Sequence, residues 1–281
     1  MSRLEERAQF VRLETVRLVA IAKSGHYSST FSCAEILSAL YYGGELRIDP
    51  ARPDWADRDR FVMSKGHAAV GLYPVLADLG FFPPSELDDY TRLGSVFADH
   101  PDVRHIPGVD FSSGSLGHGL SVAAGMALAA KLDGGDHRAI CLLGDAELNE
   151  GQIWEAAMAA AHFKLGNLVA IVDRNGMGLD GFTEEVMSIE PHHAKWEAFG
   201  WRVVHVDGHD VNAVAAAFAD LPDRRSATPT VIVADTVKGK GVPWMEFSRV
   251  WHLGAVVGDD YAELERVLRE QPVRATSEAT R

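Results

Sequence analysis

The sequence predicts an α/β protein in which a parallel sheet is covered by helices on both faces. Two observations lead to this prediction. Segments with strand character alternate with segments whose apolar residues recur at helical spacing, the order expected of βαβ units with right-handed crossovers. The strand segments are also mostly apolar without strict alternation, as expected of strands that are buried on both faces.

The N-terminal part of the chain is expected to be mainly helical. Apolar residues at helical spacing predict helices over residues 4–23 and 33–42, the second ending at a Gly-Gly pair. Residues 46–60 are rich in Asp, Arg and Pro and are expected to form a loop. A short strand is expected over residues 61–64, followed by a helix over 68–79.

From residue 114 onwards the alternation of strands and helices becomes regular. A Gly-Ser loop at 114–119 precedes a helix, 120–131, built largely from Ala and Gly, and small residues let such a helix lie close to another backbone, so we expect it to be buried. Residues 1–270 are expected to form one domain and residues 271–281 a polar tail. The further expected strands are residues 138–143, 168–173, 202–206 and 230–235, and the further helices are residues 152–163 and 213–220.

The composition limits the class of protein. The chain has 281 residues, 47% of them hydrophobic, which fits one large domain or two small ones. A chain of this length buries about three quarters of its unfolded surface, so it needs no disulfide or metal to fold. The two cysteines, Cys33 and Cys141, lie far apart and form no C-x-x-C motif, which argues against a secreted disulfide scaffold or a zinc module. We expect a cytoplasmic protein.

The charge balance excludes several partners. Lys and Arg number 27 against 40 Asp and Glu, a net charge of −13, and no basic run occurs, so we expect no nucleic-acid or anionic membrane partner. Charged residues interrupt every apolar stretch before the length of about 18 residues that a membrane span requires, and the N-terminus lacks an apolar signal core. An anionic ligand would therefore need a local device, either a metal ion or an array of backbone N–H groups.

The most specific motif begins where the strand 138–143 ends. Gly144-Asp145-Ala146 follows this strand and leads into a helix, and ligands of open α/β sheets bind at the carboxyl ends of strands. The helix N-terminus adds N–H groups and partial positive charge for an anion. Thirty residues after Asp145, the next strand leads to Asn175. A carboxylate, an amide oxygen and a backbone carbonyl from the turn would make an all-oxygen site suited to Mg²⁺ or Ca²⁺.

These motifs resemble the N-terminal, diphosphate-binding domain of transketolase, a thiamine diphosphate enzyme. That family carries a Gly-Asp-Gly turn followed roughly thirty residues later by Asn. The resemblance implies Asp145, Asn175 and the backbone carbonyl of Met177 as metal ligands, and thiamine diphosphate with Mg²⁺ or Ca²⁺ as cofactors. Ala146 replaces the usual third glycine. Binding would be weaker if that position needs a positive φ or a close phosphate contact, and unaffected if the residue only starts the helix, the alternative that we favour.

Further landmarks extend the resemblance over about residues 8–265. Tyr27 stands where the family usually has Pro, and His118 where it usually has Gln. Any one landmark is weak, but six in the same order make a chance match improbable. The landmarks are Ser24-Gly25-His26, Ser64-Lys65-Gly66-His67-Ala68, Asp99-His100-Pro101 (similar to Gly-His-Pro in the family), Gly114-Ser115-Leu116-Gly117-His118-Gly119, Thr236-Val237-Lys238-Gly239-Lys240-Gly241 and Trp251-His252.

The resemblance also implies roles. His67 would contact the cofactor diphosphate, and His26, His100 and His252 would surround the thiazolium and handle protons of a sugar substrate, which suits imidazole. Lys238 would either neutralise diphosphate charge or merely be solvated. The other cofactor-binding residues that it implies are Gly114, Ser115 and Leu116 beside the aminopyrimidine ring, Gly144 and Ala146 at the turn, Asn175, and Glu150.

Glu150 resembles a family glutamate in a carboxylate network between the two active sites of a dimer. The alternative is an ordinary acidic residue in the first turn of a helix.

In transketolases the glutamate that activates the cofactor lies on a second, pyrimidine-binding domain, for which this chain offers no segment. We therefore expect one subunit of a split transketolase that transfers a two-carbon ketol unit between sugar substrates, with a separate pyrimidine-binding subunit in an α2β2 assembly. Two alternatives stay open: a subunit of a thiamine-dependent 2-oxo acid decarboxylase or carboligase, and a non-catalytic cofactor-binding scaffold.

Overall fold

The core of the molecule is a five-stranded sheet in the order β1-β2-β3-β5-β4, and every neighbouring pair is parallel. The computed structural model describes residues 1–256 and 258–270, so the expected tail at 271–281 lies outside the described residues. The predicted parallel sheet is confirmed. Its strands are β1 (Arg60–Met63), β2 (Ala139–Gly144), β3 (Leu168–Arg174), β4 (Arg202–Asp207) and β5 (Thr230–Asp235).

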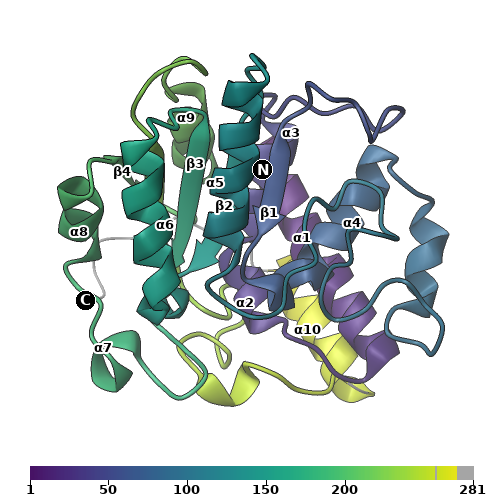
Figure 1. Ribbon diagram of the computed structural model, residues 1–281. Helices are drawn as coiled ribbons and strands as arrows, with labels where there is room; N and C mark the ends of the chain where they lie inside the picture. The colour runs from purple at the N-terminus through teal and green to yellow at the C-terminus, as the bar shows by residue number, and fades with distance from the viewer. Residues whose placement is uncertain (257, 271–281) are drawn as a thin grey trace.

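Helices cover both faces of this sheet (Figure 1). Successive residues of a strand enter opposite cores: Ile140 and Leu142 pack in one, Cys141 and Leu143 in the other. This two-sided burial is the reason for the near-continuous apolar strands. One face carries α5 (Gly119–Leu132), α6 (Gly151–His162) and α8 (His192–Ala198), and the other carries α1 (Arg3–Ala22), α3 (Ala34–Tyr42) and α9 (Val211–Ala219).

The helix α5 corrects one expectation. Only one side of it is buried in this chain, through residues such as Leu120, Ala123 and Ala127. Ser121 and Gly125 on the other side are exposed. The small residues therefore allow close packing on the sheet, but they do not bury the helix on all sides.

Several helices were not predicted. A helix of one or two turns carries too little periodicity to be recognised, which explains the short ones. The C-terminal α10 packs beside α1 (Figure 1), and its Leu264, Val267 and Leu268 are buried at a spacing that was a usable signal. The expected helix over 68–79 is α4 (Ala69–Leu79). The elements that were not predicted are α2 (Ser28–Ser32), α7 (Thr183–Val186), α8 (His192–Ala198), α10 (Asp259–Glu270) and the 3₁₀ turns η1 (Gly66–Ala68), η2 (Pro84–Asp89), η3 (Ala146–Asn149) and η4 (Arg249–Trp251).

The strand order places the site. The chain crosses the sheet from β1 to β3, continues to β4 at the edge and then reverses direction to place β5 between β3 and β4, so the switch point of the sheet lies between β3 and β5. Ligands of open α/β sheets bind at such a reversal, at the carboxyl ends of the strands.

No helix in the described part of the chain is both long and apolar enough to cross a bilayer.

Candidate active site

The predicted metal ligands come together at the carboxyl ends of β2 and β3. Asp145 directly follows β2 and is 1% exposed, and its two carboxylate oxygens accept hydrogen bonds from the backbone N–H groups of Ala146 (2.8 Å) and Gly176 (2.6 Å). Asn175 and Met177 are buried in the same turn, where the Met177 N–H donates to Asn175 Oδ1 at 3.1 Å. The residues that follow β2 and β3 therefore lie close together, as expected.

This corner has the chemistry of a cation site. Burial, and secondly the negative charge of Asp173, raise the pKa of Asp145 to about 7, so a bound cation would offset the cost of a charged carboxylate there. In residues 1–256 and 258–270, no three or more His, Cys, Asp or Glu side chains are grouped to hold a metal ion. A metal would therefore need the mixed carboxylate, amide and carbonyl donors of this turn, which fit a hard cation.

A buried ion pair underlies the corner. Lys65, which follows β1, contacts Asp173 of β3 across the end of β2, and the two side chains are 2% and 0% exposed. Ser32 Oγ donates to the same carboxylate at 2.6 Å, and Thr236 Oγ1 donates to its other oxygen. Asn175 Nδ2 lies 3.3 Å from Asp173 Oδ2, so Asp173 also holds the amide of a predicted metal ligand.

Lys238 is a second buried cation of the site. Its side chain is buried and Nζ donates to the carbonyl of Gly178 at 2.9 Å. Burial and the nearby positive charge of Lys65 lower the pKa of Lys238 to about 8. The expectation that this lysine is merely solvated is therefore wrong. Two buried ammonium groups instead supply local positive charge in a protein of net charge −13.

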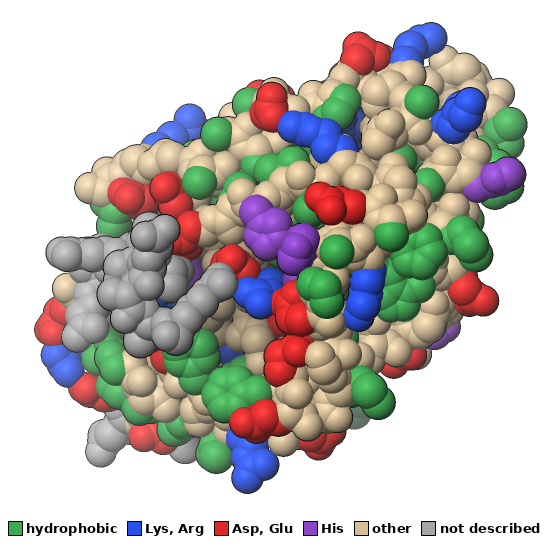
Figure 2. Space-filling view, turned by 90° about the vertical axis from the view of Figure 1, so that its left-hand side faces the viewer, with side chains coloured by type: hydrophobic (Ala, Val, Ile, Leu, Met, Phe, Trp, Pro, Cys, Tyr) green, Lys and Arg blue, Asp and Glu red, His purple; other side chains and the backbone are tan. Residues whose placement is uncertain are grey.

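Four predicted histidines converge from four separate segments. The ring centroid of His26 lies 5.3 Å from that of His67, 5.3 Å from that of His252 and 6.1 Å from that of His100. Histidine side chains gather near the middle of one face, bordered by charged groups of both signs (Figure 2). The sequence separation of these rings makes their convergence the clearest structural sign of a reaction centre.

Most of these imidazoles are neutral near pH 7. Burial, supported by the charge of Lys65, lowers the pKa of His67 well below its ordinary value. Burial and the charge of Lys238 lower the pKa of His252 to about 4, and burial also lowers the pKa of His100. His252 Nδ1 is buried, and no group in residues 1–256 and 258–270 forms a hydrogen bond with it. A polar ligand atom at this position would satisfy it.

An acidic residue for which no role was predicted, Asp99, joins the histidines. Asp99 Oδ2 lies 2.9 Å from His26 Nδ1 and 3.7 Å from His100 Nδ1. Burial would raise the pKa of Asp99, but its contact with His26 holds the pKa below the ordinary value. The sequence did offer one sign of a role for Asp99, because this residue stands where the transketolase motif has Gly.

The Gly-Ser loop is tied to the strand ends by Glu147, which was also not selected. Its Oε1 accepts from the Gly117 N–H at 2.8 Å and from Ser64 Oγ, and its Oε2 accepts from the Gly144 N–H at 3.0 Å. Gly114, at the start of the loop, lies beside the His100 ring, which a Cβ would approach to 3.6 Å. Glu147 thus fixes the predicted Gly114-Ser115-Leu116 segment relative to β1 and β2.

The departures from the family pattern have clear structural settings. Ala146 begins the 3₁₀ turn η3 and does not have a positive φ, so its backbone needs no glycine. Tyr27 is fully buried against Phe31 and Trp251, and its hydroxyl has no hydrogen-bond partner among the described residues. Glu150 and His118 are exposed, and His118 Nδ1 contacts Gln152 Nε2 at 3.1 Å. The predicted network role of Glu150 stays a prediction.

Comparison with known proteins agrees with this geometry. The family model described as "Transketolase, thiamine diphosphate binding domain" matches residues 4–274. The chain is 41% identical to an apulose-4-phosphate transketolase subunit of Phocaeicola vulgatus, over 95% of this chain and 94% of that protein. It is also 41% identical to the 6-deoxy-6-sulfo-D-fructose transketolase subunit SqwG of a Clostridium species, over 86% of this chain and 88% of that protein.

Solved structures give the same assignment. The transketolase of Leishmania mexicana superposes with a TM-score of 0.87 at 30% identity, covering 98% of this chain and 42% of that chain. The transketolase of Campylobacter jejuni superposes with a TM-score of 0.86 at 31% identity, covering 97% of this chain and 43% of that chain. The chain thus spans less than half the length of these solved transketolases. It belongs to the transketolase family, as a transferase subunit that corresponds to the thiamine diphosphate binding domain.

Proposed function

We propose that this chain is the diphosphate-binding subunit of a two-chain transketolase, which transfers a two-carbon ketol unit between sugar substrates. The observation that carries the proposal is the convergence of His26, His67, His100 and His252. The lengths support a divided enzyme, since the chain covers 94% of a relative that is named as a transketolase subunit but 42% of a solved transketolase.

A divalent cation is proposed at the β2–β3 corner. Asp145, Asn175 and the backbone carbonyl of Met177 would hold it, and Mg²⁺ or Ca²⁺ fits these hard oxygen donors. The raised pKa of Asp145 supports this assignment, because a buried carboxylate gains most from a cation.

The proposed cofactor contacts follow the geometry of the strand ends. His67, neutral because burial lowers its pKa, would donate to the diphosphate, and Lys238 would add positive charge. Thiamine diphosphate, when bound, supplies an electron sink for the two-carbon fragment. The further proposed contacts are Gly114, Ser115, Leu116, Gly144, Ala146, Glu150 and Asn175.

His26, His100 and His252 are proposed to bind and transfer protons of the substrate. Neutral imidazoles can both donate to and accept from sugar hydroxyl groups, and a low pKa keeps His100 and His252 in that form. The relatives are named for apulose 4-phosphate and 6-deoxy-6-sulfofructose, both sugars with an anionic group. We propose a ketose with a phosphate or sulfonate group as the substrate class.

The partner is proposed to be a pyrimidine-binding subunit in an α2β2 assembly. It would contribute the glutamate that activates the cofactor, while the exposed Glu150 would face the second active site. A cytoplasmic location is proposed from the two free, buried cysteines.

The test measures ketol transfer by this chain with and without the partner subunit. Ketose phosphates, hydroxypyruvate and pyruvate are offered in parallel. We expect turnover only in the complex and only with ketol donors. Turnover at ordinary enzyme rates by the chain alone would refute the divided site, and a preference for pyruvate would favour an oxo-acid enzyme.

Calorimetry tests the cation site in the same complex. We expect thiamine diphosphate to bind only with Mg²⁺, and Asp145→Asn to lose this Mg²⁺-dependent binding. The matched control is Asp54→Asn, which removes one charge from an exposed position and should bind normally. Metal-independent binding by the wild-type complex would contradict the assignment.

A further inference from the structure

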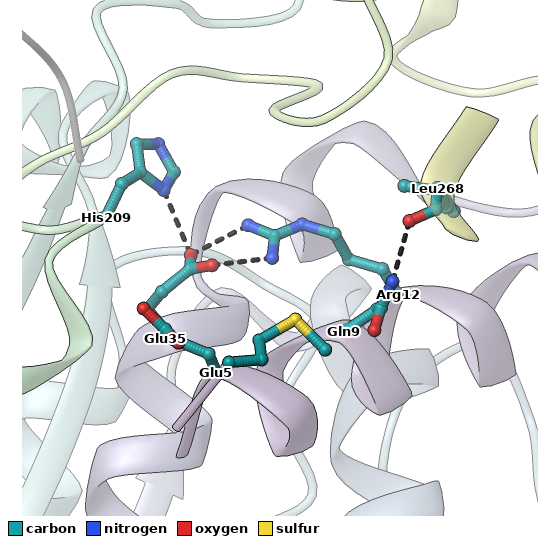
Figure 3. Close-up of a pocket in the computed structure, with 7 residues that line it drawn as sticks. Glu5, Gln9, Arg12, Glu35, His209 and Leu268 are labelled. Carbon is teal, nitrogen blue, oxygen red and sulfur yellow. Dashed lines mark hydrogen bonds and ion pairs between the residues drawn. The ribbon is translucent and has the colours of Figure 1, made fainter. Parts of the chain in front are cut away.

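A buried polar network lies behind the site, and none of the roles above uses it. Arg12 of α1 makes a two-pronged contact with Glu35 of α3, with Nη1 and Nη2 2.6 and 2.7 Å from the two carboxylate oxygens. His209, which follows β4, lies with Nδ1 2.9 Å from Glu35 Oε2. Figure 3 shows the three side chains pointing toward one another from different elements.

The network ends on a backbone amide. The Val237 N–H donates to His209 Nε2 at 2.8 Å, so Nε2 carries no proton, and Nδ1–H donates to Glu35. Arg12, Glu35 and His209 are 1%, 3% and 4% exposed, so water cannot replace a lost partner at low cost. The charge of Arg12, with the hydrogen bond from His209, outweighs burial and lowers the pKa of Glu35 to about 2.

Val237 belongs to a short segment, residues 236–238, that crosses the site. On one side of it Thr236 Oγ1 donates to Asp173, and on the other Lys238 Nζ donates to the Gly178 carbonyl. Gly178 follows the predicted metal ligand Met177. The position of residues 236–238 therefore determines where a buried ammonium group lies relative to the turn that carries Asn175 and Met177.

We propose that Arg12, Glu35 and His209 are positioning residues for cofactor binding: Arg12 and Glu35 select the His209 tautomer that accepts from Val237, and this contact holds Lys238 in the diphosphate site. The consequence for the cofactor rests on the proposed function. The hydrogen-bond relay itself does not, and it can be tested in the full chain without any ligand.

Two substitutions of His209 separate its two contacts. In His209→Asn the amide lies at the position of Nδ1 and can still donate to Glu35, but it is too short to reach Val237. In His209→Gln the side-chain oxygen lies near the position of Nε2 and can accept from Val237, while the contact with Glu35 is lost. His205→Asn is the matched control, since His205 is exposed on β4.

The first readout is hydrogen exchange of the Val237 amide in the full chain, together with ¹⁵N NMR of the His209 ring. We expect an unprotonated Nε2 in the wild type. We expect exchange about tenfold faster in His209→Asn and near wild type in His209→Gln and His205→Asn, because only His209→Asn leaves this amide unpaired. Unchanged exchange in His209→Asn, or a protonated Nε2 in the wild type, would overturn the relay.

The second readout is thiamine diphosphate affinity, measured by calorimetry with Mg²⁺ in the complex with the partner subunit. We expect the dissociation constant to rise about tenfold in His209→Asn and to recover in His209→Gln. A general loss of stability would weaken both variants alike, and that outcome would refute a positioning role.

Glu35→Gln provides the upstream test. It leaves Arg12 without its carboxylate and can turn an amide donor toward His209, so the tautomer should reverse and the Val237 amide should lose protection. A wild-type Nε2 signal in this variant would refute the selection of the tautomer by Glu35. If Glu35→Gln does not fold, the two His209 variants still decide the proposal. Failure of the wild-type complex to bind thiamine diphosphate would refute the proposed function, while the exchange and NMR results would still judge the relay.

Discussion

Replacing Lys65 by Met tests whether the buried ion pair with Asp173 supports both the fold and the site. The two side chains are 2% and 0% exposed, so the substitution leaves a carboxylate in a place that water cannot reach. Breaking a buried pair from one side costs about 3–5 kcal/mol. Ser32, Thr236 and Asn175 still donate to Asp173, which favours the lower end, about 3 kcal/mol. For a chain of this size that corresponds to a fall in Tm on the order of 10 °C.

The assay is thermal unfolding followed by circular dichroism at pH 7, with Lys131→Met as the control. Lys131 is exposed and donates to the backbone carbonyls of Phe163 and Lys164, so its replacement should cost about 1 kcal/mol or less. In Lys65→Met/Asp173→Asn the loss should be smaller than the sum of the single losses, because neither charge is left alone. A fall in Tm for Lys65→Met no larger than that of the control would show that the ion pair does not stabilise the fold.

Three further predictions concern the site. The Glu147 carboxylate accepts three hydrogen bonds, and in Glu147→Gln the side-chain NH₂ group must face at least one of these donors, so the unfolding free energy should fall by about 1–3 kcal/mol. The control Glu155→Gln changes an exposed residue and should not lower it, so equal Tm values for the two variants would contradict the prediction. Asp99→Asn should lower kcat about tenfold with unchanged cofactor affinity, because His26 loses its carboxylate neighbour; an unchanged kcat would exclude that role. The pKa of His252 is about 4 in the folded chain against an ordinary value of 6.5, so between these pH values only the unfolded chain gains a proton and the stability should fall as the pH drops from 6.5 to 4. His252→Gln should lack the part of this pH dependence that comes from His252. An NMR titration that gives His252 a pKa near 6.5 in the folded chain would refute the prediction.

The sequence predicted the fold well where periodicity spans several turns or a whole buried strand. All five strands lie within one or two residues of their expected bounds, because each is a nearly continuous apolar run between polar turns. The short helices α2, α7 and α8 were missed, since four to seven residues show no clear period. The residue types at Asp145 and Asn175 also led to the expected corner, because consecutive parallel strands end at the same edge.

Contacts between segments distant in sequence could not be predicted in this way. Lys65 and Asp173 are 108 residues apart, and β1, which Lys65 follows, does not neighbour β3, so neither spacing nor pairing rules connect them. Arg12 and Glu35 lie on helices whose apolar faces were recognised, but a buried charge on such a face has no visible partner in the sequence. Glu147 had the same difficulty, since two of its three donors, Ser64 and Gly117, come from segments that are 83 and 30 residues away.

The amino-acid sequence alone was enough to predict the alternation of strands and helices, the polar residues at the strand ends and the family to which the chain belongs. Those properties depend on local spacing and on motifs that are contiguous in the chain. The folded structure was needed to establish which buried charges pair, that Lys238 is buried, and that His209 joins a network behind the site. The physical reason is that the electrostatics of a buried group depend on the neighbours that packing brings within a few ångströms, and those neighbours lie anywhere along the chain.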